Sequence, residues 1–146
     1  MNIETLDLTV LWAHAVSPWF MAGLIWFVQV VHYPLKASVG SATFATYQAR
    51  HVERTGWVVG PPMLIEAATA AWLVLAPPAG VSHGLSLVGL GALGVVWLAT
   101  AIFSVPAHGR LSRGFDAQVH LRLVRTNWIR TVGWSARGVI AILLFP

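Results

Sequence analysis

Residues 9–33 have the sequence TVLWAHAVSPWFMAGLIWFVQVVHY, which contains no Asp, Glu, Lys or Arg. A helix needs about 20 apolar residues to cross the hydrocarbon core of a bilayer, so this stretch is long enough to span one at a tilt. Three further apolar stretches follow at about 57–76, 84–105 and 126–145. The sequence therefore predicts an all-α integral membrane protein that folds as a four-helix bundle.

The composition of the whole chain supports this class. The 146 residues are 57% hydrophobic and 10% charged, whereas a soluble domain has roughly 25% charged residues. Too few polar residues remain to cover a water-soluble globule, so lipid is expected to cover it. The basic residues predict contact with anionic lipid headgroups and no binding of nucleic acid, since no separate basic domain exists.

The basic residues also predict an orientation in the membrane. Of the nine Lys and Arg residues, seven lie within 34–56 and 106–126, and the other two are Arg130 and Arg137. Because Lys and Arg accumulate in cytoplasmic loops, these two stretches are expected in the cytoplasm. A multi-pass protein of the plasma (inner) membrane follows, with both termini on the outer side.

Prolines are expected to divide the chain. Residues 42–58 predict a helical extension on the cytoplasmic side that leads to span two and is interrupted at Gly60-Pro61-Pro62. Pro34 is expected to end span one and Pro106 to end span three, because proline lacks the backbone N–H that continues a helix. We find no internal repeat, so residues 1–146 are predicted to form one domain.

Two charged residues lie near the middle of predicted spans. Glu66 belongs to span two and Arg137 to span four, at matching depth. A charge at this depth is costly and usually faces the interior of the bundle, so the two are expected to pair. A neutral, protonated Glu66 is the alternative. The pair has either a structural role, fixing the order of the helices, or a functional one.

Span four carries a polar stripe, because Asn127, Arg130, Trp134 and Arg137 follow at spacings of three, four and three. These spacings place them on one helix face. Arginine offers a planar fork of donors, so the stripe predicts a site for an anionic or polarised group. For Arg130 the alternative is a side chain that reaches the cytoplasmic surface.

Span one offers His14, Gln29 and His32 as polar candidates. The two histidines share a helix face, but at 1.5 Å per residue they lie about 27 Å apart and cannot bind one metal. No metal site is predicted. His14 is either a haem or metal ligand with partners from other helices or, more commonly, a hydrogen-bonded packing residue. His51, His108 and His120 are assigned to cytoplasmic loops without a special role.

Together these residues predict an elongated internal cleft. It is expected to open near Gln29 and Arg130, with Glu66 and Arg137 at its floor. Inward-facing polar residues would then span most of the depth of the bundle, and each unpaired one costs free energy in hydrocarbon. A purely structural bundle has no need of them.

The C-terminal third resembles a known family. VPAH at 105–108, Leu111 and LVRTNWIRT at 123–131 are similar to segments of the anthrone-oxygenase-like family of small four-helix membrane proteins. That family closes span three with Val-Pro-x-Asn and opens span four with a Trp/Asn/Arg segment. Asn127, Trp128 and Arg130 fit the second segment, whereas His108 replaces the usual Asn. Because some fungal members oxidise anthrones to anthraquinones, the resemblance implies a hydrophobic aromatic substrate.

A second likeness is to small membrane protoporphyrinogen oxidases, which also have a histidine early in the first helix. They also have a Trp-x-x-Gly stretch, and Trp19-Phe20-Met21-Ala22-Gly23 is similar to it with one more residue between Trp and Gly. This likeness implies haem chemistry. The sequence itself leaves the cofactor open.

Three functions are therefore considered. The first is binding, with oxidation left open, of a lipophilic aromatic or quinone-like molecule. In it Glu66 carries protons, Arg130 and Arg137 stabilise negative charge, and the binding residues are His14, Gln29, His32, Asn127 and Trp134. The second is a non-enzymatic accessory subunit of a larger membrane complex, and the third is a haem-binding redox protein. Each of the three functions is compatible with a homo-oligomer.

Overall fold

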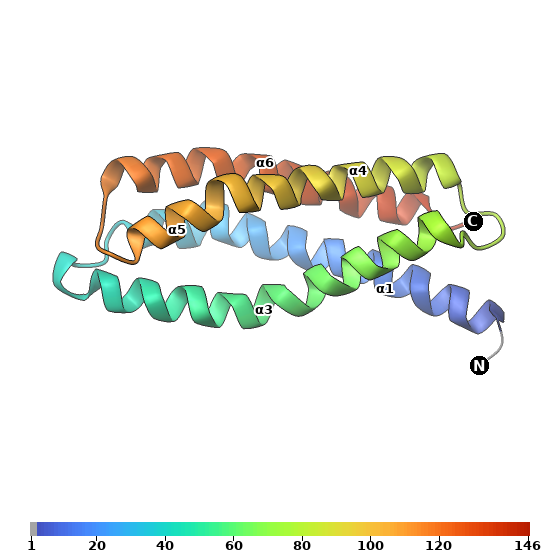
Figure 1. Ribbon diagram of the computed structural model, residues 1–146, viewed down its shortest axis with the longest axis horizontal. Coiled ribbons are helices and arrows are strands. Elements are labelled where there is room, and N and C mark those ends of the chain that lie inside the picture. Colours follow the sequence, from blue (N-terminus) through green and yellow to red (C-terminus); the bar gives the residue numbers. More distant parts are fainter. Residues whose placement is uncertain (1–2) are drawn as a thin grey trace.

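The structure is a computed structural model that describes residues 3–146, and four long helical rods run through it (Figure 1). The first rod joins α1 (Ile3–Phe27), the π-helix η1 (Val28–His32) and α2 (Tyr33–Lys36). The second is α3 (Ser41–Leu75). The third joins α4 (His83–Ala99), the π-helix η2 (Thr100–Ser104) and α5 (Val105–Leu111), and the fourth is α6 (Ala117–Leu143). The predicted all-α class with four helices is confirmed.

The rods form a ring in which each contacts two neighbours. Contacts join α1 to α3, α3 to α4, α4 to α6 and α6 back to α1. Successive rods run in opposite directions, so the start of α1 and the C-terminus lie at the same end as the α3–α4 link (Figure 1). We call this the distal end. The opposite end, with the loops 37–40 and 112–116, is called the basic end.

Three of the rods are long and apolar enough to cross a membrane. They are Glu4–Lys36, Ser41–Leu75 and His83–Leu111. The fourth, α6, is not among them, since Asn127, Arg130 and Arg137 lower its hydropathy. The side chains of those residues are buried inside the bundle. They are therefore not exposed on the outer surface of the bundle.

The expectation that Pro34 and Pro106 end their helices is wrong. Each proline is the second residue after a π-helix. The N–H of Tyr33 bonds to the carbonyl of Val28, and that of Val105 bonds to the carbonyl of Thr100. The ring of a proline clashes with the carbonyl four residues earlier in an α-helix, and the wider π turn relieves this crowding. The helices therefore continue to Lys36 and Leu111.

The interruption expected at Gly60-Pro61-Pro62 is also absent, because α3 continues through both prolines. The two missing N–H groups remove the donors for the carbonyls of Trp57 and Val58. The helix bends instead of ending, and Figure 1 shows α3 changing direction midway along its length. The predicted extension before span two and span two itself thus form one rod.

The two halves of the chain share a short pattern. The π-helices begin at Val28 and Thr100, and the same offset separates Pro34 from Pro106. RTGWV at 54–58 has its counterpart in RTNWI at 125–129, with an offset one residue shorter. The match is short enough to escape a search for longer repeats. Two hairpins of similar design, α1–α3 and α4–α6, therefore build the ring.

The buried apolar side chains form three clusters along the bundle. At the distal end the cluster contains Leu11, Leu73 and Leu144. The middle cluster is formed by Met21, Ala22, Ile25, Val96 and Trp134. At the basic end lie Tyr33, Phe44, Ala107, Leu111 and Leu123.

Candidate functional site

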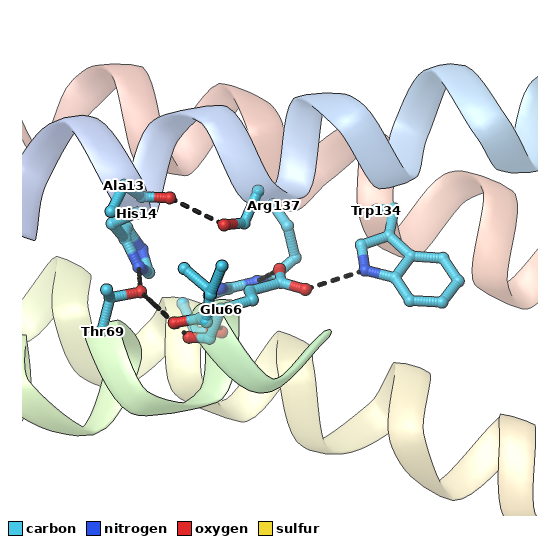
Figure 2. A network of polar contacts seen from close by, with 9 residues as sticks. Ala13, His14, Glu66, Thr69, Trp134 and Arg137 are labelled. Carbon is cyan, nitrogen blue, oxygen red and sulfur yellow. Dashed lines mark hydrogen bonds and ion pairs between the residues drawn. The ribbon is translucent and has the colours of Figure 1, made fainter. Parts of the chain in front are cut away.

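Glu66 and Arg137 form a buried ion pair, as predicted. Nε of Arg137 donates to Oε1 of Glu66 at 2.8 Å, and neither side chain is exposed (Figure 2). The guanidinium also donates through NH1 to the carbonyl of Gly89 at 2.7 Å. A Cβ at Gly89 would lie 3.1 Å from that NH1 atom, so glycine leaves the space that Arg137 occupies. The pair thereby ties α3, α4 and α6 together.

Trp134 and His14 complete what we call the ion-pair network. The indole Nε1 of Trp134 donates to Oε2 of Glu66 at 3.0 Å (Figure 2). One turn further along α3, Oγ1 of Thr69 donates to the carbonyl of Ile65 at 2.8 Å and bonds to Nδ1 of His14 at 2.9 Å. Since the hydroxyl hydrogen is used on the backbone, His14 acts as the donor. His14 is thus buried and hydrogen-bonded to Thr69.

Arg130 belongs to a different chain of hydrogen bonds. Its NH1 donates to Oγ of Ser104 and to Oδ1 of Asn127, each at 3.1 Å. Nδ2 of Asn127 donates to Oε1 of Gln29 at 2.8 Å, which links α6 to η1. The guanidinium also lies over the ring of Trp134, 5.2 Å from its centroid. Arg130 is 9% exposed and does not reach the surface as an extended side chain.

A cavity of about 380 Å³ lies between the middle and basic-end clusters, and we call it the basic-end cavity. Its volume is in the range of small-molecule sites. Much of the wall is apolar, with Met21, Leu24, Ile25, Val28, Val52, Val59 and Val105 among the lining residues. Its polar lining comes from Tyr33, His51, Thr55, Thr100, Ser104, His108, Ser112 and Arg130. Both π-helices contribute to the wall.

Buried polar groups continue from the cavity toward the basic end. The Tyr33 hydroxyl lies 3.4 Å from Nε2 of His108, and Nδ1 of the same ring lies 3.0 Å from Nε2 of Gln48. His32 stacks on His51 with ring centroids 4.4 Å apart. Lys36 is 1% exposed, and its Nζ has no hydrogen-bond partner in the described part of the chain.

His120 lies beyond the predicted spans, where Nε2 donates to the carbonyl of Tyr33 at 3.0 Å. Burial lowers the pKa of His120 below its usual 6.5, the hydrogen bond to Tyr33 opposes that shift, and the charge of Lys36 adds to it. The net shift favours the neutral form of the ring. Within residues 3–146 no three His, Asp or Glu side chains are placed to hold a metal.

Comparison of the chain with protein-family models, with curated proteins and with solved structures found no match. The resemblance of residues 105–131 to the anthrone-oxygenase-like family therefore stays a prediction. The site has to be argued from its own residues.

The structure divides the predicted site residues between two places. Arg130 lines the basic-end cavity, whereas the lining contains none of Glu66, Arg137, His14, Gln29, His32, Asn127 and Trp134. The predicted cleft with Glu66 and Arg137 at its floor is wrong. The middle cluster, with Met21 and Trp134, fills the space between Arg130 and the ion pair. Gln29 and Asn127 support Arg130 from outside the cavity.

Several residues of the cavity were not predicted from the sequence as site residues, among them Tyr33, His51, Ser104 and His108. His108 follows Pro106, where its helix was expected to end, and was therefore assigned to a loop. The sequence signal available was an X-Pro pair in each half, Tyr33-Pro34 and Val105-Pro106. It marks where both π-helices bring polar residues to the bundle interior.

Proposed function

We propose that this protein is a multi-span membrane protein that binds a lipophilic aromatic or quinone-like small molecule in the basic-end cavity. The observation that carries the proposal is an apolar cavity of about 380 Å³ with Arg130 in its wall. Apolar side chains supply most of the contact, and a few convergent polar groups fix the orientation of the ligand. An oxygen of the ligand would lie toward Arg130, Tyr33 and His108.

The resemblance of residues 105–131 supports an aromatic ligand independently. Within that segment, Val105, His108 and Arg130 all line the cavity. The segment that is similar to the anthrone-oxygenase-like family therefore contributes directly to the proposed site. The proposal concerns binding, and no chemical step is assigned to the residues.

A blocked cavity tests this function. Gly109 lines the cavity, and a Cβ added there meets no atom within 4 Å. We expect Gly109→Phe to abolish binding of a naphthoquinone by the purified protein, measured by equilibrium dialysis against matched empty micelles. Gly91→Phe is the control, since Gly91 is exposed on α4, lies outside the lining and has the same free space. Equal binding by both variants would contradict the proposal.

The proposed orientation places the basic end in the cytoplasm and both termini outside. It rests on the basic residues that gather near the loops 37–40 and 112–116 and on the accumulation of Lys and Arg in cytoplasmic loops. A reporter that is active only in the cytoplasm should be active when inserted within 36–54 or 110–122. It should be inactive at residue 146, and activity there would reverse the orientation.

A further inference from the structure

The basic-end cavity contains a buried cation that no acidic side chain balances. The chain has five acidic residues. Glu4 and Asp7 lie at the start of α1, Glu53 is exposed, Glu66 pairs with Arg137, and Asp116 caps α6. Among the described residues none of them lines the cavity or forms an ion pair with Arg130.

Arg130 also keeps unused hydrogen-bonding capacity. Its Nε is buried and has no partner among the described residues, while NH1 is held by Ser104 and Asn127. Burying an ionised group without a counter-charge carries a desolvation cost that is large compared with the net stability of a domain. A bound anion in the cavity would reduce that cost.

The first half of the chain has an apolar residue at the position that matches Arg130. With the offset of the RTGWV and RTNWI segments, the position equivalent to Arg130 in the first half is Val59. Both residues line the cavity. The fold therefore holds a valine at one of these two positions and an arginine at the other.

Further positive charge lies behind the polar wall. Nζ of Lys36 is 5.9 Å from the centroid of the Tyr33 ring and has no hydrogen-bond partner in the described part of the chain. Tyr33 in turn lies in the cavity wall beside His108. Two buried cations thus act on the same end of the cavity, and both favour a negatively charged occupant.

We propose that the cavity takes its ligand as an oxygen anion, a carboxylate or an ionised hydroxyquinone, with the charged oxygen on Arg130. This inference rests on the proposed function and adds the charge of the ligand to it. The Tyr33 side chain interacts with Arg130, its hydroxyl lies 3.4 Å from Nε2 of His108, and all three residues line the cavity. The apolar body of the ligand packs against Met21, Ile25 and Val59.

Matched ligand pairs test the charge directly. The first pair is 2-hydroxy-1,4-naphthoquinone, which is ionised at neutral pH, and its neutral 2-methoxy analogue. The second pair is decanoate and methyl decanoate, which replaces the ring system by an alkyl chain. Binding is measured on the full chain in detergent by equilibrium dialysis, with empty micelles on the reference side to subtract partitioning.

We expect the anion of at least one pair to bind about tenfold more tightly than its neutral partner, as a charge-assisted hydrogen bond would give. Arg130→Gln should abolish this preference, and Arg130→Lys should keep part of it. Arg125→Gln, which removes an exposed arginine from the same helix, should leave the preference unchanged. The pair that shows the effect tells whether the ligand is aromatic or aliphatic.

Other outcomes separate this inference from the proposed function. Equal or tighter binding of the neutral members would overturn the anion and leave the binding function intact. An anion preference that survives Arg130→Gln would remove Arg130 from the site. Binding of no ligand would overturn both. If Arg130→Gln does not fold, the wild-type comparison of charged and neutral members still decides the question.

Discussion

Arg130 and Arg137 lie two helical turns apart on one face of α6, yet their surroundings differ in charge and in packing. Arg137 donates to Glu66 and to the carbonyl of Gly89. The side chains of Arg137 and Glu66 are both fully buried. Arg130 has hydroxyl, amide and indole neighbours but no carboxylate, and it borders a cavity. Arg137 thus holds helices together, whereas Arg130 is proposed to bind a ligand.

The repeat explains how the difference is built. With the offset of RTGWV and RTNWI, Glu66 and Arg137 occupy equivalent positions in the two halves, and they meet across the bundle. Val59 and Arg130 are likewise equivalent, but there the first half offers an apolar side chain. Glu66 neutralises Arg137, whereas Val59 offers no charge to Arg130.

The largest expected effect is on the ion pair. Arg137→Gln should lower the free energy of unfolding in detergent by about 3–5 kcal/mol, because it leaves a buried carboxylate without its partner. Glu66→Gln should act similarly, and the double variant should lose less than the sum. Arg125→Gln is the control for loss of charge from α6. Strict additivity would show that the two residues do not interact.

Trp134 contacts both Glu66 and Arg130. A substitution can remove its hydrogen bond to Glu66 and keep its aromatic contact with Arg130. Trp134→Phe removes the donor to Oε2 of Glu66 and keeps an aromatic ring beneath Arg130. Leaving a buried acceptor without its donor should cost about 1–3 kcal/mol of stability. Trp128→Phe, on the exposed side of α6, should change stability by less than about 0.5 kcal/mol. A loss at Trp128 as large as at Trp134 would contradict this assignment.

Arg130 should contribute little to stability in the absence of a ligand. In Arg130→Met the lost hydrogen bonds to Ser104 and Asn127 are offset by removal of an unpaired buried charge. We expect the free energy of unfolding to change by at most about 1 kcal/mol in either direction. A loss equal to that of Arg137→Gln would end the distinction between the two arginines.

The smallest expected effect is a pH dependence at the basic end. Because burial lowers the pKa of His120 below 6.5, the folded state binds fewer protons than the unfolded state just below that pH. Stability should therefore fall as the pH drops through about 6.5. Replacement by Gln should reduce this fall, measured by thermal unfolding between about pH 7 and pH 5.

The control for that measurement is His83→Gln, which removes an exposed histidine at the distal end. It should leave the fall in stability unchanged. A wild-type protein whose stability rises on acidification would show that His120 is charged in the folded state.

Much of the fold follows from local rules that act on the sequence. Apolar length predicts the helices, and the spacing of Asn127, Arg130, Trp134 and Arg137 predicts which face of α6 is buried. All four are buried in the structure. The helix ends at Pro34 and Pro106 were wrong because a π turn, which depends on the crowding around one carbonyl, has no signature in hydropathy. That error placed Lys36 and His108 in loops.

The sequence by itself determined that long apolar helices enclose a few charged residues, because each such charge must avoid hydrocarbon. It also determined that Glu66 and Arg137 would pair, since they were the two charges at matching depth. Only the tertiary structure decided which arginine stays unpaired and which space it faces. That outcome depends on the ring of four rods, which places Glu66 opposite Arg137 and fills the middle with Met21 and Trp134. Side chains far apart in the chain make these contacts, and no local spacing specifies them.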